Sequence, residues 1–206
     1  MTEALKAQRE VVDFLASAAC HDGVTPEHVE THLSHLFLAG DRVFKLKKAL
    51  QWAMVDYETL ARREHFCRYE VEVNAATAPE IYLGVLPVTR EADGLALGGS
   101  GEAVDFVVEM RRFAADEQLD RMVDAGTITP DIVDATADVV AAMHRAARRV
   151  RLADGAEAVS ARTAQLASDV AASPRAPAAD VAAWERAATA IEKRRAGLLA
   201  RRARHG

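Results

Sequence analysis

The chain has 206 residues, of which 50% are hydrophobic and 28% are charged, with a formal net charge of -5. This composition supports a folded core and excludes a wholly disordered chain. No apolar run approaches the roughly eighteen residues of a membrane-spanning helix, and the N-terminus lacks the apolar core of a signal peptide. Two cysteines are too few for a disulfide framework, and an acidic chain offers no overall field for nucleic acid. We therefore expect a cytoplasmic, mostly helical protein without membrane or nucleic-acid partners.

The first 110 residues mix helical and β-type patterns. Apolar positions within residues 4–19 share roughly one helical face and predict an opening helix. Two β-rich runs, 29–38 and 42–46, flank a short turn at Gly40 and predict a hairpin. A charged helix is expected over 56–75. Further strand patterns follow within residues 81–88, 91–101 and 104–110. The pattern over 104–110 is apolar at nearly every position, which predicts a central strand. These elements predict a small antiparallel sheet with one helix packed across it.

Helical patterns dominate the rest of the chain. Thr129, Pro130 and Asp131 supply a cap, a first-turn proline and an early acid, which together indicate a helix start. The helix that they open spaces its apolar residues for burial. Four helices are expected in this part: residues 116–124, 130–149, 155–172 and 178–204. The predicted organisation is therefore a sheet-containing part over 1–110 and a helical part over 111–206.

The strand segment RVFKLK, residues 42–47, contains the most informative side chains. With a period of two, Val43, Lys45 and Lys47 share one face, and an inward-pointing lysine needs a partner because an unpaired buried ammonium is costly. The helix over 56–75 can supply the partner carboxylate through Glu64, Glu70 or Glu72. A strand lysine held by a helix glutamate is how protein-kinase-like folds bind nucleotide phosphates. Spacing alone favours the other interpretation, in which the lysines solubilise an exposed edge strand.

A family resemblance is carried by the order of the elements and by four stretches of sequence. The order is a hairpin with a lysine strand, an acid-bearing helix, further strands and a helical half. The stretches are VETHLSHLFLAGDRVFKLKKAL (29–50), DYETLARREHFCRYEVEVNAATAPEIYLGVLPVT (56–89), VDFVVEMRRF (104–113) and ADVVAAMHRAA (137–147). Over almost its whole length, the chain resembles the aminoglycoside phosphotransferase-like kinases, in particular the branch often fused to a P-loop ATPase domain. The resemblance implies an α+β fold: a protein-kinase-like small lobe over 1–110, then an incomplete, all-helical start of the large lobe.

The resemblance also implies roles for individual residues. Lys45 corresponds to the strand lysine that contacts phosphate, and Lys47 is its rival on the same face. Glu70 corresponds to the ion-pair partner, with Glu72 second. The hinge, whose backbone groups hydrogen-bond adenine, corresponds to the residues after the apolar strand: Glu109, Met110 and Arg111. The expected cofactors are ATP and Mg²⁺, and the expected acceptor is a small molecule whose identity the sequence leaves open.

The family's catalytic loop, a His-Gly-Asp-x-His-x-x-Asn-like run, does not occur in the 206 residues, and neither does the later metal-binding aspartate. Phosphoryl transfer depends on these groups. We therefore name no catalytic residue and no metal ligand. We expect the N-terminal part of an ATP-dependent small-molecule phosphotransferase that binds nucleotide but is inactive as given. The alternative is a complete, catalytically dead kinase-like module that binds or scaffolds, and that self-associates through an exposed helical face carrying Trp184.

Three other features receive structural interpretations. Residues 98–101 are glycine-rich, but without a following Gly-Lys-Ser/Thr they indicate a hairpin turn rather than a Walker loop. The pairs Cys20-His21 and His65-x-Cys67 lack the spacing of a zinc site and are interpreted as a buried thiol and surface histidines. Asp105 enters the apolar strand, is interpreted as a lone buried acid and receives no role.

Overall fold

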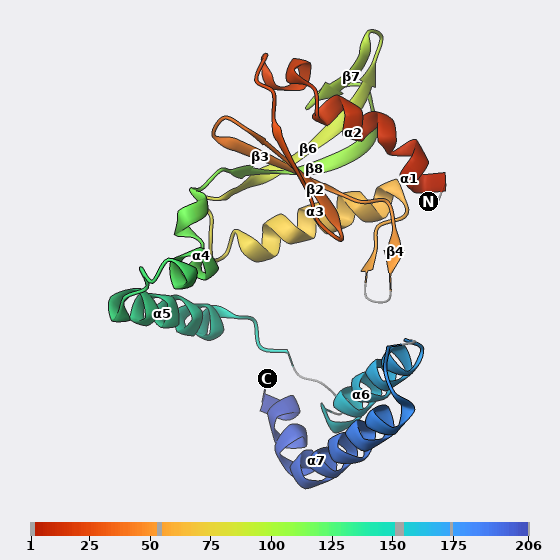
Figure 1. The fold of residues 1–206 in the computed structure, drawn as a ribbon, viewed down its shortest axis with the longest axis vertical. Coiled ribbons are helices and arrows are strands. Elements are labelled where there is room, and N and C mark those ends of the chain that lie inside the picture. The colour runs from red at the N-terminus through yellow and green to blue at the C-terminus, as the bar shows by residue number, and fades with distance from the viewer. Residues whose placement is uncertain (1–2, 53–54, 151–154, 174, 206) are drawn as a thin grey trace. The chain divides into compact units, whose positions relative to one another are not determined.

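The computed structural model describes residues 3–52, 55–150, 155–173 and 175–205 (Figure 1). The chain forms two compact units, one reaching His144 and the other beginning at Arg145. The first contains an antiparallel sheet with helices on both faces, and the second contains two long helices. The protein is therefore α+β, as expected. The end of the sheet at Arg111 lies close to the predicted boundary at residue 110, whereas the compact units divide farther along the chain.

Within the described residues, the main sheet has six antiparallel strands in the order β1-β2-β3-β8-β6-β7. Their bounds are Glu27–Glu30 (β1), Ser34–Ala39 (β2), Arg42–Lys47 (β3), Tyr82–Glu91 (β6), Gly94–Leu97 (β7) and Glu102–Arg111 (β8). Strand β8 lies between β3 and β6, which confirms the prediction that this apolar strand is central. The β2–β3 hairpin is also confirmed, and Gly40 provides the left-handed conformation (φ +57°) at its turn.

The single strand predicted over 29–38 is wrong, because the chain reverses direction inside it. Strands β1 and β2 are separate and pair antiparallel, with His28 opposite Phe37. At the reversal the Thr31 hydroxyl donates to the Ser34 carbonyl at 2.9 Å, and it accepts from the Ser34 amide at 3.0 Å. A threonine side chain that satisfies nearby backbone groups competes with the strand ladder and favours a turn.

One face of the sheet packs against the N-terminal helices. The predicted opening helix over 4–19 is divided into α1 (Glu3–Ala7), α2 (Arg9–Leu15) and a 3₁₀ turn (Ala18–His21). Helix α2 covers the core of this face, so the prediction of one helix across the sheet is incomplete. The buried residues of this core are Val11, Leu15, Phe37, Ala39, Phe44, Leu46, Val88 and Val107.

Helix α3 (Leu60–Asn74) covers the opposite face, as Figure 1 shows. Its buried contacts centre on Cys67, Phe106 and Val108. The helix begins later than the predicted residue 56, because Thr59 caps it by accepting a hydrogen bond from the Arg62 amide at 3.3 Å. A short hairpin, β4 (Gln51–Trp52) and β5 (Val55–Asp56), occupies the preceding residues.

After β8 the first unit continues with a 3₁₀ turn (Ala115–Glu117), α4 (Leu119–Asp124) and α5 (Pro130–Ala146). The burial expected for the apolar face of 130–149 is wrong for four residues, which are 42–56% exposed: Val133, Val139, Val140 and Met143. In the second unit, α6 (Gly155–Ala171) packs against α7 (Ala178–His205). None of the helices in the described ranges is both long enough and apolar enough to cross a bilayer.

Candidate functional site

Strand β3 presents Lys45 and Lys47 to α3. Both side chains lie on the same face as Val43, because side chains alternate along a strand. The Lys45 ammonium donates to Glu70 Oε1 at 2.7 Å, and the Lys47 ammonium donates to Glu70 Oε2 at 2.5 Å. The structure thus brings together both candidate lysines and the first candidate acid. The edge-strand interpretation of the lysines is wrong, since β3 is paired on both sides, with β2 and β8.

The three candidate acids of α3 have different surroundings. Glu70 faces the sheet, and its side chain is 12% exposed. Glu64 pairs with Arg68 at 2.8 Å one turn farther along the helix, where both side chains are solvent-accessible. Glu72 is exposed. Helical periodicity therefore selects Glu70, which lies on the buried side together with Cys67.

The two lysines differ in burial. Lys47 is 5% exposed at its side chain and lies over the Tyr57 ring, with Nζ 5.0 Å from the ring centre. The Lys45 side chain is 27% exposed. Lys45 is therefore the ammonium that a ligand can reach, whereas Lys47 is enclosed by protein. Proximity to a carboxylate does not discriminate between them, because both bind Glu70.

The cluster carries an excess of positive charge. Burial raises the pKa of Glu70, but the hydrogen bonds and positive charges of Lys45 and Lys47 outweigh this effect and hold it below its ordinary value. Glu70 is thus a carboxylate at neutral pH. One carboxylate balances only one of the two ammonium groups, so one positive charge remains at a partly buried position, where electrostatic interactions with an anion are stronger than in bulk water.

A pocket of about 460 Å³ is lined in part by neighbours of Lys45 in the sheet. Lys45 lies opposite Leu36, which lines the pocket, and two residues along β3 from Val43, a separation of about 7 Å. The volume falls in the range of small-molecule sites. Its apolar lining comes from four strands and the segment after β8: Val29, Leu36, Leu38, Val43, Met110, Phe113, Ala114 and Ala115. Charged and polar side chains complete the lining: Glu27, Arg111, Arg112, Gln118 and Arg121.

The predicted hinge, Glu109, Met110 and Arg111, lies inside β8 rather than after it, because pairing with β3 and β6 extends the strand to Arg111. Met110 lines the pocket. The Glu109 side chain pairs instead with Arg42 at 3.2 Å, and the Arg111 amide donates to the Ile81 carbonyl at 2.8 Å. The chain that borders the pocket beyond the sheet is therefore residues 112–115.

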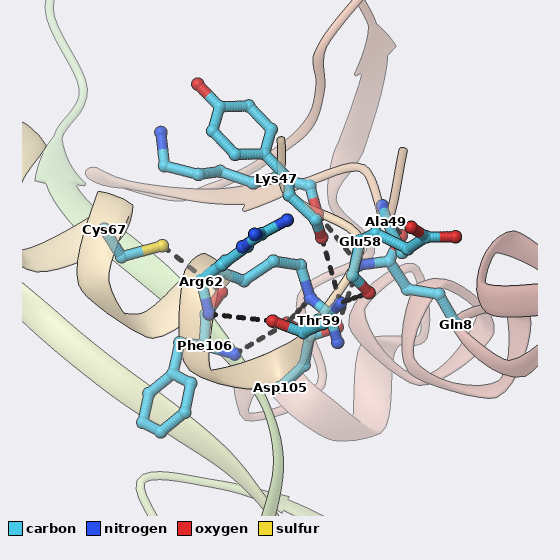
Figure 2. Close-up of polar contacts among 11 residues, drawn as sticks. Gln8, Lys47, Ala49, Glu58, Thr59, Arg62, Cys67, Asp105 and Phe106 are labelled. Carbon is cyan, nitrogen blue, oxygen red and sulfur yellow. Dashed lines mark hydrogen bonds and ion pairs between the residues drawn. The ribbon is translucent and has the colours of Figure 1, made fainter. Parts of the chain in front are cut away.

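Asp105, predicted to be a lone acid without a role, is instead the centre of a buried network. Its Oδ1 accepts from Arg63 Nε at 2.8 Å, and its Oδ2 accepts from Gln8 Nε2 at 2.8 Å. Figure 2 shows Asp105 between α3 and the N-terminal helices. The sequence signal for Arg63 is its position seven residues before Glu70, which places both on one face of α3. Gln8 carries no comparable signal.

Cys67 is fully buried beside this cluster, with Sγ 3.7 Å from the Phe106 carbonyl oxygen. Burial raises the pKa of its thiol to about 12. Across the residues that the structure describes, no three histidine, cysteine, aspartate or glutamate side chains are grouped so that they could hold a metal ion.

Comparison with known proteins gives relatives without an assigned activity. No protein-family model matches the chain, and no solved structure matches it. Proteins described as uncharacterized from Mycobacterium bovis and from two strains of Mycobacterium tuberculosis are each 37% identical to it over 125 residues. This match covers 61% of the chain and 24% of each relative. The chain thus matches about a quarter of the length of these curated relatives.

Proposed function

We propose that the sheet and α3 form the nucleotide-binding small lobe of an ATP-dependent small-molecule phosphotransferase of the aminoglycoside phosphotransferase-like type. The observation that carries the proposal is the sharing of Glu70 by Lys45 and Lys47, together with a pocket lined in part by neighbours of Lys45 in the sheet. A ligand suited to this arrangement has a flat apolar part and an anionic part. The sequence resemblance of residues 29–50 and 56–89 to this kinase family supports a nucleotide as that ligand.

In the proposed complex, the base occupies the pocket between Leu36, Val43 and Met110, and the phosphates extend along β3 to Lys45. The Lys45 ammonium is accessible and can donate to a phosphate oxygen while Glu70 orients it. Lys47 remains under Tyr57, where it holds the other oxygen of Glu70. The two lysines therefore have different proposed roles: Lys45 contacts the ligand and Lys47 positions the acid.

The activity proposed for this chain itself is nucleotide binding. In the family that it resembles, the catalytic base and the Mg²⁺ ligands belong to a His-Gly-Asp run and a later aspartate, and the 206 residues contain neither motif. Transfer of a phosphoryl group to a hydroxyl-bearing small molecule is accordingly proposed for longer proteins that combine this lobe with those motifs.

Titration of the chain with a fluorescent ADP analogue and Mg²⁺ tests the proposal. Lys45→Met removes the ligand-facing charge and is expected to raise the Kd about tenfold, the effect of losing one charge-assisted contact. Lys193→Met, on the exposed surface of α7, makes the same change in net charge and is expected to leave the Kd unchanged. Absence of binding by the wild type, or equal binding by Lys45→Met, contradicts the proposal. Displacement of the ADP analogue by adenosine tests separately whether the pocket binds the base.

A second candidate, a binding module that self-associates, is favoured by exposed apolar side chains on two helices. Val139 on α5 is 56% exposed, and Trp184 and Ile191 on α7 are 42% and 52% exposed. Trp184 and Ile191 are seven residues apart and share one face of α7, and exposed apolar surface of this kind marks interaction sites. Sedimentation velocity over a concentration series tests this candidate: it requires dimers of the wild type and monomers of Trp184→Glu.

A further inference from the structure

Gln8 is a buried glutamine that connects three segments distant in sequence. Its side-chain amide donates to the Lys47 carbonyl and to Asp105 Oδ2, and its side-chain oxygen accepts from the Ala49 amide, each at 2.8 Å. The residue is 4% exposed and lies at the N-cap of α2. Figure 2 shows Gln8 reaching this junction from the N-terminal helices. Gln8 thus holds the end of the strand that carries both lysines.

Arg63 completes the junction from α3. Its Nε donates to Asp105 Oδ1 at 2.8 Å, and its Nη1 donates to the carbonyl oxygens of Tyr57 at 3.1 Å and Glu58 at 2.9 Å. The Arg63 and Asp105 side chains are 8% and 1% exposed. The remaining capacity of the acid is used by the Phe106 amide, which donates to Oδ1 at 2.9 Å. A buried ion pair is tolerated when its polar atoms are satisfied in this way.

The junction fixes α3 at two points along one face. Arg63 and Glu70 are seven residues apart, which is about two turns or 10.5 Å along the axis. Arg63 is held by Asp105 of β8, and Glu70 is held by the two lysines of β3. Two attachments at this separation resist both rotation of the helix about its axis and sliding along the sheet.

We propose that Gln8, Asp105 and Arg63 are positioning residues that hold α3 and β3 in the register at which Glu70 reaches both lysines. The N-terminal helix α2 then contributes to the geometry of the proposed phosphate site through Gln8, although none of its residues contacts the ligand. The effect on nucleotide affinity rests on the proposed function, whereas the effect on the geometry of Glu70 does not.

The first experiment follows the Glu70 carboxyl group by carbon NMR in the nucleotide-free chain. Gln8→Met keeps the length of the side chain and removes its three hydrogen bonds, and Arg63→Met removes the attachment of α3. Both variants are expected to raise the pKa of Glu70 toward its ordinary value, because a displaced α3 moves the carboxylate away from the ammonium groups.

Phe37→Leu is the matched control. Phe37 is buried in the core that packs against α2 and pairs with His28 and Phe44 rather than with a residue of the junction, so its truncation destabilises the fold without removing a junction contact. It is expected to leave the pKa of Glu70 unchanged. If the network contributed only to general stability, the pKa of Glu70 would also be unchanged in folded Gln8→Met and Arg63→Met. An unchanged pKa in these two variants overturns the positioning proposal.

The second experiment is a double-mutant cycle on nucleotide affinity. Gln8→Met is expected to weaken binding of the ADP analogue by about threefold to tenfold in the wild-type background and by less than about twofold in a Glu70→Gln background. Equal losses in the two backgrounds mean that Gln8 does not act through Glu70 and overturn the proposal. Failure of the wild type to bind nucleotide contradicts the proposed function instead, and the NMR titration then decides the positioning role alone.

Discussion

Lys45 and Lys47 lie two positions apart on β3 and donate to opposite oxygens of the same carboxylate, at 2.7 and 2.5 Å. Among the described residues, neither ammonium pairs with a second carboxylate. Glu70 therefore does more than neutralise one charge, because it also screens two like charges on one strand face from each other. The consequences for stability and for pH dependence are both measurable.

Glu70→Gln is expected to lower the free energy of unfolding by about 2–4 kcal/mol, because it leaves two partly buried ammonium groups beside a neutral amide. The change preserves the size of the side chain and its position on α3. Urea unfolding followed by circular dichroism gives the difference at neutral pH.

Glu64→Gln is the control for this substitution. Glu64 lies on the same helix and is also paired, but its partner Arg68 is 63% exposed, so its ion pair is screened by solvent. The expected loss is below about 0.5 kcal/mol. Similar losses of unfolding free energy in Glu70→Gln and Glu64→Gln would mean that Glu70 stabilises the fold no more than a surface ion pair does.

The stability difference between wild type and Glu70→Gln is expected to shrink as the pH falls. The pKa of Glu70 is held below its ordinary value of 4.5 in the folded state, so the carboxylate binds its proton more readily after unfolding. Its contribution is therefore complete above the ordinary value and is lost as the pH falls through the folded-state pKa.

Urea midpoints of both proteins between about pH 6 and about pH 3 check this expectation. Comparing the two proteins cancels the contributions of exposed carboxylates whose pKa is also lowered, such as Glu10 beside Arg90 and Glu30 beside Lys48. A difference that stays constant with pH would show that Glu70 does not titrate differently in the folded and unfolded states.

Local patterns predicted the parts of the fold that local rules control. The period of two placed Lys45 and Lys47 on one face of a strand, and Gly40 marked the hairpin turn beside it. The uninterrupted apolar run of β8 predicted a central strand. The predicted boundaries of helices and strands were less accurate. Strand β8 continues to Arg111 because it pairs with β3 and β6, and this pairing is not visible in the residues of β8 alone.

The buried network could not be predicted, because its members are far apart in sequence. Gln8 and Asp105 are separated by 97 positions, and Arg63 and Asp105 by 42. The sequence indicates that Asp105 is a lone buried acid but gives no partner for it, and a glutamine near a helix start resembles an ordinary surface residue. Only the packing of α2 and α3 on opposite faces of the sheet brings them to one point.

Both cysteines are expected to react slowly with iodoacetamide in the native chain at about pH 8, because the thiolate is the reactive form. Burial raises the pKa of Cys67 to about 12, and burial together with the charge of Asp22 raises that of Cys20 to about 11. Mass spectrometry of labelled protein measures each site, and labelling in urea provides the unfolded reference. Rapid native labelling of Cys67 would contradict its burial between α3 and the sheet.

Two glycines of the second unit are expected to respond oppositely to alanine. A Cβ at Gly155, the first residue of α6, would lie 2.7 Å from the Cβ of Ala203 and 2.9 Å from the Leu199 carbonyl oxygen, both on α7. Gly155→Ala must therefore separate the two helices and is expected to cost about 1–3 kcal/mol.

Gly197, within α7, has no atom within 4 Å of the corresponding position. Gly197→Ala is expected to stabilise the unit by up to about 1 kcal/mol, because alanine loses less backbone entropy on forming a helix. Thermal unfolding of the two variants and the wild type measures both effects. Stabilisation by Gly155→Ala would show that α6 and α7 do not approach each other at Gly155 as closely as the structure has them.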